Sequence, residues 1–242
     1  MAKGGNLGGE ADQIGIAEAR VALAWWLDSG VDVVVQDQAR DWLAPPAPKP
    51  RVAEPPPPNI VEPTSESLDQ LREWLSSSMQ LPLASATAKR ILPHGPEDAA
   101  VMLLSDAPTF EDASAGQPIG GEAWELAKRM LAAIRIPAER AYSASLSCLH
   151  VPGTKMSPAD REACAEIARK HVKLARPKRL LLLGDGPAQA LLGKTVAQAR
   201  GHAHKIQGVR TVATFHPRFL IQNPARKAEA WKDLLLLMED EA

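Results

Sequence analysis

The chain has 242 residues, of which 45% are hydrophobic and 24% are charged, and its formal net charge is −1. This length suffices for one core of ordinary domain size with an extension. The near-neutral charge excludes a generally basic protein, so any nucleic acid must be held by a local patch. Two cysteines exclude a disulfide framework, and the start of the chain has no long apolar run. We therefore expect a cytoplasmic protein with no membrane segment.

Proline divides the chain into two unequal parts. Residues 44–66 are rich in proline, which resists helix and sheet, so we predict a semi-rigid linker there. Before it, residues 1–43 are predicted to be a helical extension, with one helix at residues 17–27 and a second, shorter one at residues 37–43. We expect this small extension to dock on the main domain or to be poorly ordered. Its two adjacent tryptophans point either to a protein partner or to ordinary docking contacts.

After the linker, in a domain predicted at residues 67–242, short apolar runs alternate with longer amphipathic segments. The runs predicted to be buried strands are residues 99–104, 142–149, 178–183 and 209–215. The segments predicted to be helices are residues 121–134, 158–174, 187–192 and 224–238. Such alternation implies parallel strands with right-handed crossovers. We therefore predict an α/β fold, a three-layer α/β/α sandwich with a four-stranded parallel sheet.

The carboxyl ends of parallel strands share one rim of the sheet, where open α/β folds bind their ligands. The segments predicted at this rim are residues 105–108, 143–148, 184–186 and 216–217. In the last of them, Pro217 forces a turn directly after the strand and directs the imidazole of His216 out of the sheet edge. These segments are therefore the candidates for chemistry.

Short motifs follow one another through the predicted domain in a fixed order. The chain reads Ser-Asp-Ala-Pro-Thr at residues 105–109, Pro-Ile-Gly-Gly at 118–121, Ser-Ala-Ser-Leu-Ser-Cys at 143–148, His-Pro-Arg-Phe-Leu at 216–220 and Lys-Ala-Glu-Ala-Trp-Lys-Asp at 227–233. In order and spacing, residues 68–240 resemble the iron-sulfur type of uracil-DNA glycosylase, often called family 4. Members of that family carry Gly-Glu-Ala-Pro-Gly, Pro-Phe-Val-Gly, Thr-Asn-Val-Val-Lys-Cys-Arg-Pro, His-Pro-Ser-Tyr-Leu and Lys-x-x-x-Trp-x-Asp at the corresponding places.

The resemblance implies hydrolysis of the N-glycosidic bond between a base and its sugar in DNA. That reaction needs a base that has left the stack, a stabilised base anion and a water at the sugar carbon. The family's carboxylate near the water and the sugar cation corresponds to Asp106, and its histidine that donates to the leaving base corresponds to His216. From the residues alone, two alternatives stay open. Asp106 is also suited to a turn before Pro108, and His216 to a structural role.

Several positions around the implied base pocket depart from the family. The pocket residues that the resemblance implies are Ser105, Ala107, Pro108, Phe110, Ile119 and Ala144. Ala144 stands in place of a base-reading Asn and Ile119 in place of a stacking Phe, and each such contact is worth about 1–3 kcal/mol. Phe110 is the aromatic residue that could substitute for the lost stack. We therefore expect changed or lost activity on uracil.

The cysteines lead to a prediction about the cofactor. Cys148 and Cys164 stand where the family has its third and fourth cluster ligands, but Ser78 and Leu81 stand where it has the first two. An iron-sulfur cluster of that type needs four thiolates. We therefore predict no cluster, no other metal and no cofactor, with both cysteines as small buried residues. Rescue of a metal site by histidine is the alternative, although the histidine spacing fits no familiar pattern.

Contact with DNA is predicted from basic residues and one tight turn. The residues predicted to bind DNA are Gly186, Arg200, Lys205, Arg218 and Lys227. Lysine and arginine supply most of the sequence-independent affinity for phosphate, and the amides at a helix start also suit a phosphate. The alternative is an ordinary solvated surface.

A nucleotide-binding loop is a competing interpretation. Residues 188–195, Ala-Gln-Ala-Leu-Leu-Gly-Lys-Thr, fit a loose phosphate-loop pattern after a strand. However, the first five of these residues are helix-forming and apolar, and the pattern's glycine would stand at a helix C-terminus, where phosphate is disfavoured.

Two functions remain after this comparison. The first is a DNA-repair glycosylase that excises a deaminated base through Asp106 and His216. The second is a catalytically inactive glycosylase-fold protein that binds DNA or a partner.

Overall fold

The computed structural model describes residues 16–30, 65–154 and 156–239, and the chain divides into two compact units, Met1–Ala53 and Glu54–Ala242. In the first unit, α1 (Ile16–Asp28) confirms the helix predicted at residues 17–27. The predicted second helix and the prolines of the linker lie outside the described residues. The predicted domain boundaries stay predictions.

The second unit is built around a five-stranded sheet in the order β3-β2-β5-β7-β6. Four of its strands are the predicted parallel ones: β2 (Val101–Ser105), β3 (Ala141–Ser145), β5 (Arg179–Leu183) and β7 (Val209–Thr214). The predicted three-layer α/β fold is thereby confirmed. The predicted segment 142–149 is not one strand, because β3 ends at Ser145 and β4 (Leu149–His150) pairs elsewhere, with β1 (Lys89–Arg90).

The prediction of only four strands needs one correction, because β6 (Ala203–Ile206) adds an antiparallel edge strand. Only Ile206 of this strand is buried, so no apolar run revealed it. A two-residue turn joins β6 to β7, and both its residues have positive φ, 51° at Gln207 and 79° at Gly208. Such turns match the twist of a hairpin.

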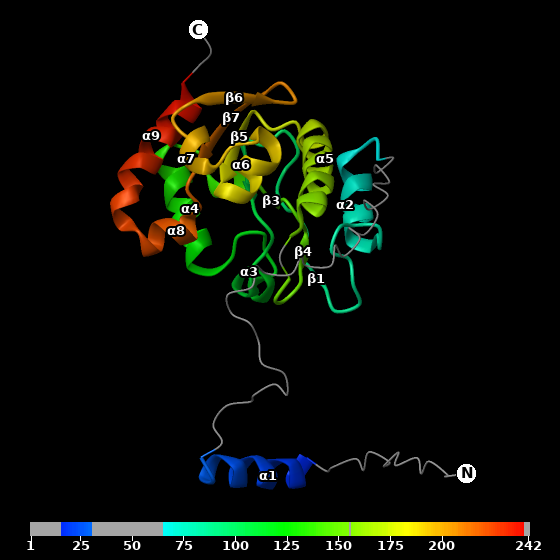
Figure 1. Cartoon of the computed structure of the whole chain (residues 1–242). Coiled ribbons are helices and arrows are strands. Elements are labelled where there is room, and N and C mark those ends of the chain that lie inside the picture. Colours follow the sequence, from blue (N-terminus) through cyan, green and yellow to red (C-terminus); the bar gives the residue numbers. More distant parts are fainter. Residues whose placement is uncertain (1–15, 31–64, 155, 240–242) are drawn as a thin grey trace, which may run out of the picture. The chain divides into compact units, whose positions relative to one another are not determined.

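Helices cover both faces of the sheet (Figure 1). One face is covered by α4 (Gly121–Ala133) and α9 (Lys227–Met238), and the other by α5 (Pro158–Ala175), α6 (Asp185–Leu192) and α7 (Val196–Ala199). Successive strand residues point to opposite faces, so Met102 joins the core beneath α5 and Leu103 the core beneath α4. Every β2 residue is buried, as expected of a central strand.

Shorter helical elements complete the domain. They are α2 (Leu68–Ser77), α3 (Phe110–Ala115), α8 (Pro217–Gln222) and the 3-10 turns η1 (Ala138–Arg140) and η2 (Pro224–Arg226). Among them, α2 packs against α5. The predicted helix at 224–238 therefore begins as η2 and continues as α9. None of the helices in the described ranges is long and apolar enough to span a bilayer.

Candidate functional site

A cavity of about 270 Å³ lies at the carboxyl ends of β2, β5 and β7. Its walls come from the loop after β2, the turn between β5 and α6, and the start of α8. Six of the residues predicted from the sequence line it: Ser105, Asp106, Ala107, Gly186, His216 and Arg218. The fold thus brings together residues that are up to 113 positions apart in the sequence, from 105 to 218.

Asp106, the first residue after β2, is exposed in this cavity and lies against Gly186. A Cβ atom added at Gly186 would stand 2.2 Å from Cγ of Asp106, far inside contact distance. No side chain larger than hydrogen fits at position 186 while Asp106 keeps this position. The glycine predicted to bind a phosphate therefore also makes room for the carboxylate.

His216 forms both the end of the strand β7 and the start of the helix α8. Its Nδ1 accepts a hydrogen bond of 3.1 Å from the backbone N–H of Arg218, which caps α8. Burial and then the nearby Arg218 charge lower the pKa of His216 to about 4, against a weaker opposite effect of Asp112. The ring is therefore neutral at pH 7. Since Nδ1 accepts, the ring proton sits on Nε2, for which residues 16–30, 65–154 and 156–239 supply no hydrogen-bond acceptor.

Asp112 is a cavity residue that sequence reasoning missed. The residue is 2% exposed, and its carboxylate accepts hydrogen bonds from the Thr109 N–H and hydroxyl at 2.8 Å each, and from the Gly120 N–H at 2.7 Å. Arg218 Nη2 also donates to it at 2.8 Å. A signal was available, because Thr-x-x-Asp is a capping box, and this box starts α3. Asp112 joins α3 to the start of α8 across the cavity.

A second buried carboxylate, Asp233 of α9, holds the end of β7. It accepts from the Thr214 hydroxyl at 2.8 Å and from Arg200 Nε at 3.1 Å. Burial raises its pKa, and these donors partly offset the effect. The Arg200 guanidinium also lies 4.9 Å from the ring centre of Phe215, next to His216. Arg200, predicted to bind DNA, is thus engaged inside the domain as a support for His216.

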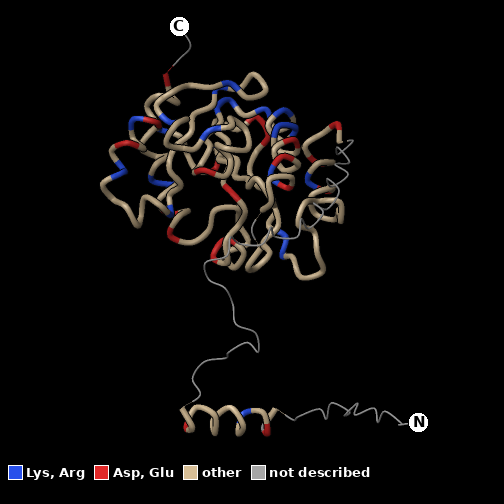
Figure 2. The backbone as a smooth tube through the Cα atoms, viewed as in Figure 1, with Lys and Arg blue, Asp and Glu red and all other residues tan. Residues whose placement is uncertain are grey.

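The other predicted DNA contacts lie away from the cavity. Lys205 is on β6 opposite Arg210, near the start of β7, whereas His216 follows the end of that strand. Lysines and arginines recur along the segment from β6 to α9 (Figure 2). Lys227 is exposed at the start of α9 and lines a separate apolar groove with Trp231. The structure therefore does not gather these basic residues around His216.

Four of the predicted base-pocket residues do not line the cavity. Ile119 and Ala144 are fully buried in the cores on opposite faces of the sheet. Pro108 is buried, and its carbonyl oxygen accepts a hydrogen bond of 2.7 Å from His150 Nδ1. Phe110 is 77% exposed at the first position of α3, so it does not replace a stacking ring inside the cavity.

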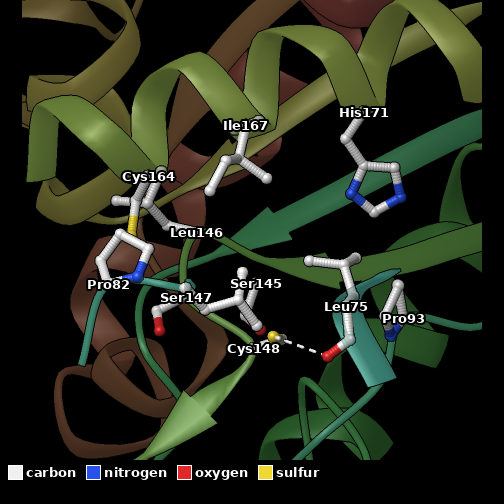
Figure 3. A pocket seen from close by; sticks show the side chains of 12 residues that line it. Leu75, Pro82, Pro93, Ser145, Leu146, Ser147, Cys148, Cys164, Ile167 and His171 are labelled. Carbon is white, nitrogen blue, oxygen red and sulfur yellow. Dashed lines mark hydrogen bonds between the residues drawn. The ribbon is translucent and has the colours of Figure 1, made fainter. Parts of the chain in front are cut away.

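The two cysteines line a different, smaller cavity of about 20 Å³ (Figure 3). That space holds about one water molecule. Burial raises the pKa of Cys148 to about 11 and that of Cys164 to about 12, so both are neutral thiols at pH 7. Leu81, at an expected ligand position, is buried in the same apolar cluster as Cys148. These residues do not fit an iron-sulfur cluster, which needs four thiolates and more space.

Hydrogen bonds and apolar contacts hold together the region around Cys148, Cys164 and Leu81, here called the cysteine corner. Arg90 donates from Nη1 to the Leu75 carbonyl at 2.8 Å and from Nη2 to the Ser78 carbonyl at 2.6 Å, which ties β1 to the end of α2. His171 lines the small cavity but is hydrogen-bonded to the Tyr142 hydroxyl at 2.8 Å. Within the described ranges, no three His, Cys, Asp or Glu side chains are arranged to hold a metal ion.

The structure also bears on the phosphate-loop interpretation. Residues 188–192 are the second half of α6, and Gly193 is its C-cap in the left-handed region, with φ of 66°. The helix thus presents its C-terminal end to Gly193 and Lys194, which disfavours phosphate there.

Comparison with known proteins identifies the family. The profile of the uracil DNA glycosylase superfamily matches residues 92–235, more than half of the chain. The chain belongs to the uracil-DNA glycosylase superfamily. It is 24% identical over 179 residues to the type-4 uracil-DNA glycosylase of Archaeoglobus fulgidus, covering 69% of this chain and 90% of that protein. The type-4 uracil-DNA glycosylase of Pyrobaculum aerophilum is 23% identical over 180 residues, covering 70% and 92%. The resemblance to family 4 is thereby confirmed.

Proposed function

We propose that this superfamily member hydrolyses the N-glycosidic bond of a damaged base in DNA and acts in base-excision repair. The observation that carries the proposal is the juxtaposition of an exposed carboxylate, Asp106, with a neutral histidine, His216, in one cavity at the strand ends. Both correspond to the family's motif positions. A cavity of about 270 Å³ approaches the usual size of a small-molecule site.

His216 is suited to stabilise the departing base. When the bond between the sugar carbon and the base nitrogen breaks, both electrons go to the base, and negative charge develops on its ring. Nε2–H of the neutral imidazole donates a hydrogen bond to that charge. The backbone N–H of Arg218, by occupying Nδ1, fixes this tautomer. A donor that is already in place needs no reorganisation during the reaction.

Asp106 acts on the sugar side of the same bond. Its carboxylate stabilises the positive charge that develops on the sugar and orients a water molecule toward the sugar carbon. The water oxygen forms the new bond to carbon, and its proton passes to the carboxylate and then to the released base. Gly186 keeps the space that Asp106 needs.

The alternative is a glycosylase-fold protein that binds DNA or a partner without excision. One observation favours it: the cavity carries exposed carboxylates, Asp106 and Asp185, while its cation Arg218 is paired with Asp112. This charge distribution gives little attraction for phosphate. DNA contact in either reading therefore depends on surfaces outside the cavity.

Base release from modified oligonucleotides distinguishes the two. We expect release of at least one base from a panel containing uracil, hypoxanthine and xanthine, and loss of release in His216→Ala. The control is His202→Ala, since His202 is an exposed histidine outside the cavity. Salt-sensitive DNA binding with no release from any substrate would establish the binding module instead.

A protein partner and the cellular location complete the proposal. The helix α1 exposes six large apolar side chains: Ile16, Val21, Leu23, Trp25, Trp26 and Leu27. We propose that these side chains bind a protein partner, and that the protein works in the cytoplasm, where its two free thiols stay reduced. Deletion of residues 16–28 should abolish co-purification with that partner and leave base release unchanged.

A further inference from the structure

Arg218 is a cavity residue whose side chain takes no part in the proposed mechanism. It extends from the first turn of α8 and lines the cavity, with 29% of its side chain exposed. Nη2 donates to Asp112 Oδ1 at 2.8 Å, and Nε lies 3.6 Å from a Glu111 carboxylate oxygen. Since Asp112 is itself fixed by three further hydrogen bonds, the guanidinium is held in one position.

The charge balance around Arg218 indicates what it can bind. Asp112 and Glu111 offset its positive charge, and Asp106 adds another negative charge to the cavity. A phosphate therefore gains little there. The guanidinium still has donors to offer, because no acceptor for its Nη1 is found within the part of the chain that the structure describes. A neutral acceptor edge suits such a group better than an anion does.

Other cavity donors are already engaged. The Ser105 hydroxyl donates to the Pro118 carbonyl at 3.1 Å, and the Thr109 hydroxyl donates to Asp112. The Ala144 side chain lies in the core and carries no polar atom. Among the side chains that line this cavity, those with donors available to a base are therefore His216 and Arg218.

We propose that Arg218 reads the base, and that the preferred base is a 6-oxopurine such as hypoxanthine. This inference rests on the proposed function, since it assigns the substrate class of the same cavity. A guanidinium matches the neighbouring acceptors O6 and N7 of a 6-oxopurine with two parallel donors. Adenine presents an amino group in place of O6, and uracil has no acceptor in place of N7. Both therefore match Arg218 less well.

Guanine has the same O6 and N7 edge, and its exclusion has a separate physical cause. The base must leave the duplex to enter the cavity, and extrusion costs least for a weakly paired base. Hypoxanthine opposite cytosine lacks the third hydrogen bond that the guanine amino group makes. Selection against guanine is therefore expected in duplex DNA and is expected to weaken in single strands.

The test measures binding of the full chain to uncleaved DNA by fluorescence anisotropy. The probes are duplexes with one 2′-fluoroarabino nucleotide, whose fluorine destabilises the sugar cation and prevents excision, bearing hypoxanthine, 7-deazahypoxanthine, adenine or uracil. We expect hypoxanthine to bind about tenfold more tightly than 7-deazahypoxanthine, in which a carbon replaces N7. This comparison uses the unaltered protein, so it carries no risk of misfolding.

A variant then assigns the effect to Arg218. Arg218→Lys keeps the charge but not the two parallel donors, and we expect it to bind hypoxanthine and 7-deazahypoxanthine equally. The matched control is Arg226→Lys, because Arg226 is an exposed arginine that pairs with Glu229 outside the cavity. It should keep the tenfold preference.

Three outcomes would overturn the inference. The first is equal binding of hypoxanthine and 7-deazahypoxanthine by the unaltered protein, and the second is an unchanged preference in Arg218→Lys. The third is an equal loss of affinity for all four probes in Arg218→Lys, which is the signature of a phosphate contact. Release of uracil with no N7 effect would leave the proposed function standing and refute this inference. Tighter binding of hypoxanthine than of 7-deazahypoxanthine, without release of any base, would support this inference and refute the proposed function.

Discussion

The strand-end cavity contains a carboxylate and a histidine at the positions of the family motif, whereas the cysteine corner has only two of the four cysteines. The cavity holds an exposed carboxylate and a neutral imidazole in about 270 Å³. The corner holds two neutral thiols and Leu81 around about 20 Å³. Arg90 and apolar contacts secure the corner. In this chain, hydrogen bonds and apolar contacts therefore hold the region where the family has its cluster ligands.

The largest effect on the rate of base release is expected for His216→Ala, in the cavity. Removal of one preorganised donor to a developing anion costs about 10²- to 10³-fold in rate. Loss of the α8 cap costs only about 1 kcal/mol of stability. Single-turnover base release, with a thermal melt to verify folding, measures both. A rate within a few-fold of the unaltered protein would remove His216 from the mechanism.

At the cysteine corner, Leu81→Ala is expected to lower the free energy of unfolding rather than the rate of base release. Leu81 is 7% exposed in the apolar cluster, and truncation of a buried leucine costs about 2–5 kcal/mol. Urea denaturation gives this value, and Met79→Ala, at a 66% exposed position nearby, is the control. Base release at low temperature should stay within a few-fold. Unchanged stability would show that the corner is not held by apolar contacts.

A smaller effect at the cavity is expected for Gly186→Ala. The added Cβ would displace Asp106, so we expect a rate loss of about tenfold, which corresponds to about 1.4 kcal/mol. When Asp106→Asn is already present, adding Gly186→Ala should lower the rate of base release little further, because both changes act on the side chain of residue 106. Additive losses in the double variant would separate Gly186 from Asp106.

Acid sensitivity links the two regions, since His171 is buried and His216 is partly buried. Burial lowers the pKa of His171 and of His216 to about 4, from 6.5. The unfolded chain takes up these protons below pH 6.5 while the folded chain does not. Stability should therefore fall as the pH drops from about 6.5 to about 4, with a slope of about 1.4 kcal/mol per pH unit for each histidine. Urea melts across this range should show a shallower slope in His171→Gln.

Much of the fold could be predicted from the sequence, and so could the position of Asp106 and His216 at one rim of the sheet. Apolar runs identified β2, β5 and β7, because central parallel strands are buried on both faces. β6 escaped detection, since an edge strand with one buried residue has no such run. His216 was found because Pro217 fixes the strand end in the sequence itself.

The distant partners of charged residues could not be predicted from the sequence. Asp112 meets Arg218 across 106 positions, and Arg200 meets Asp233 across 33. A basic residue looks the same in the sequence whether it faces solvent or a buried carboxylate. The sequence therefore predicted Arg200 as a DNA contact, whereas the fold engages it in support of β7.

The decisive measurement is base release by protein that contains no iron. The protein is dialysed against a chelator, its iron content is shown to be negligible, and single-turnover release is measured on the panel of modified oligonucleotides with His216→Ala alongside. We expect release that requires His216 and is unchanged by the chelator. Release that appears only after iron-sulfur reconstitution, or that survives in His216→Ala, would contradict this expectation.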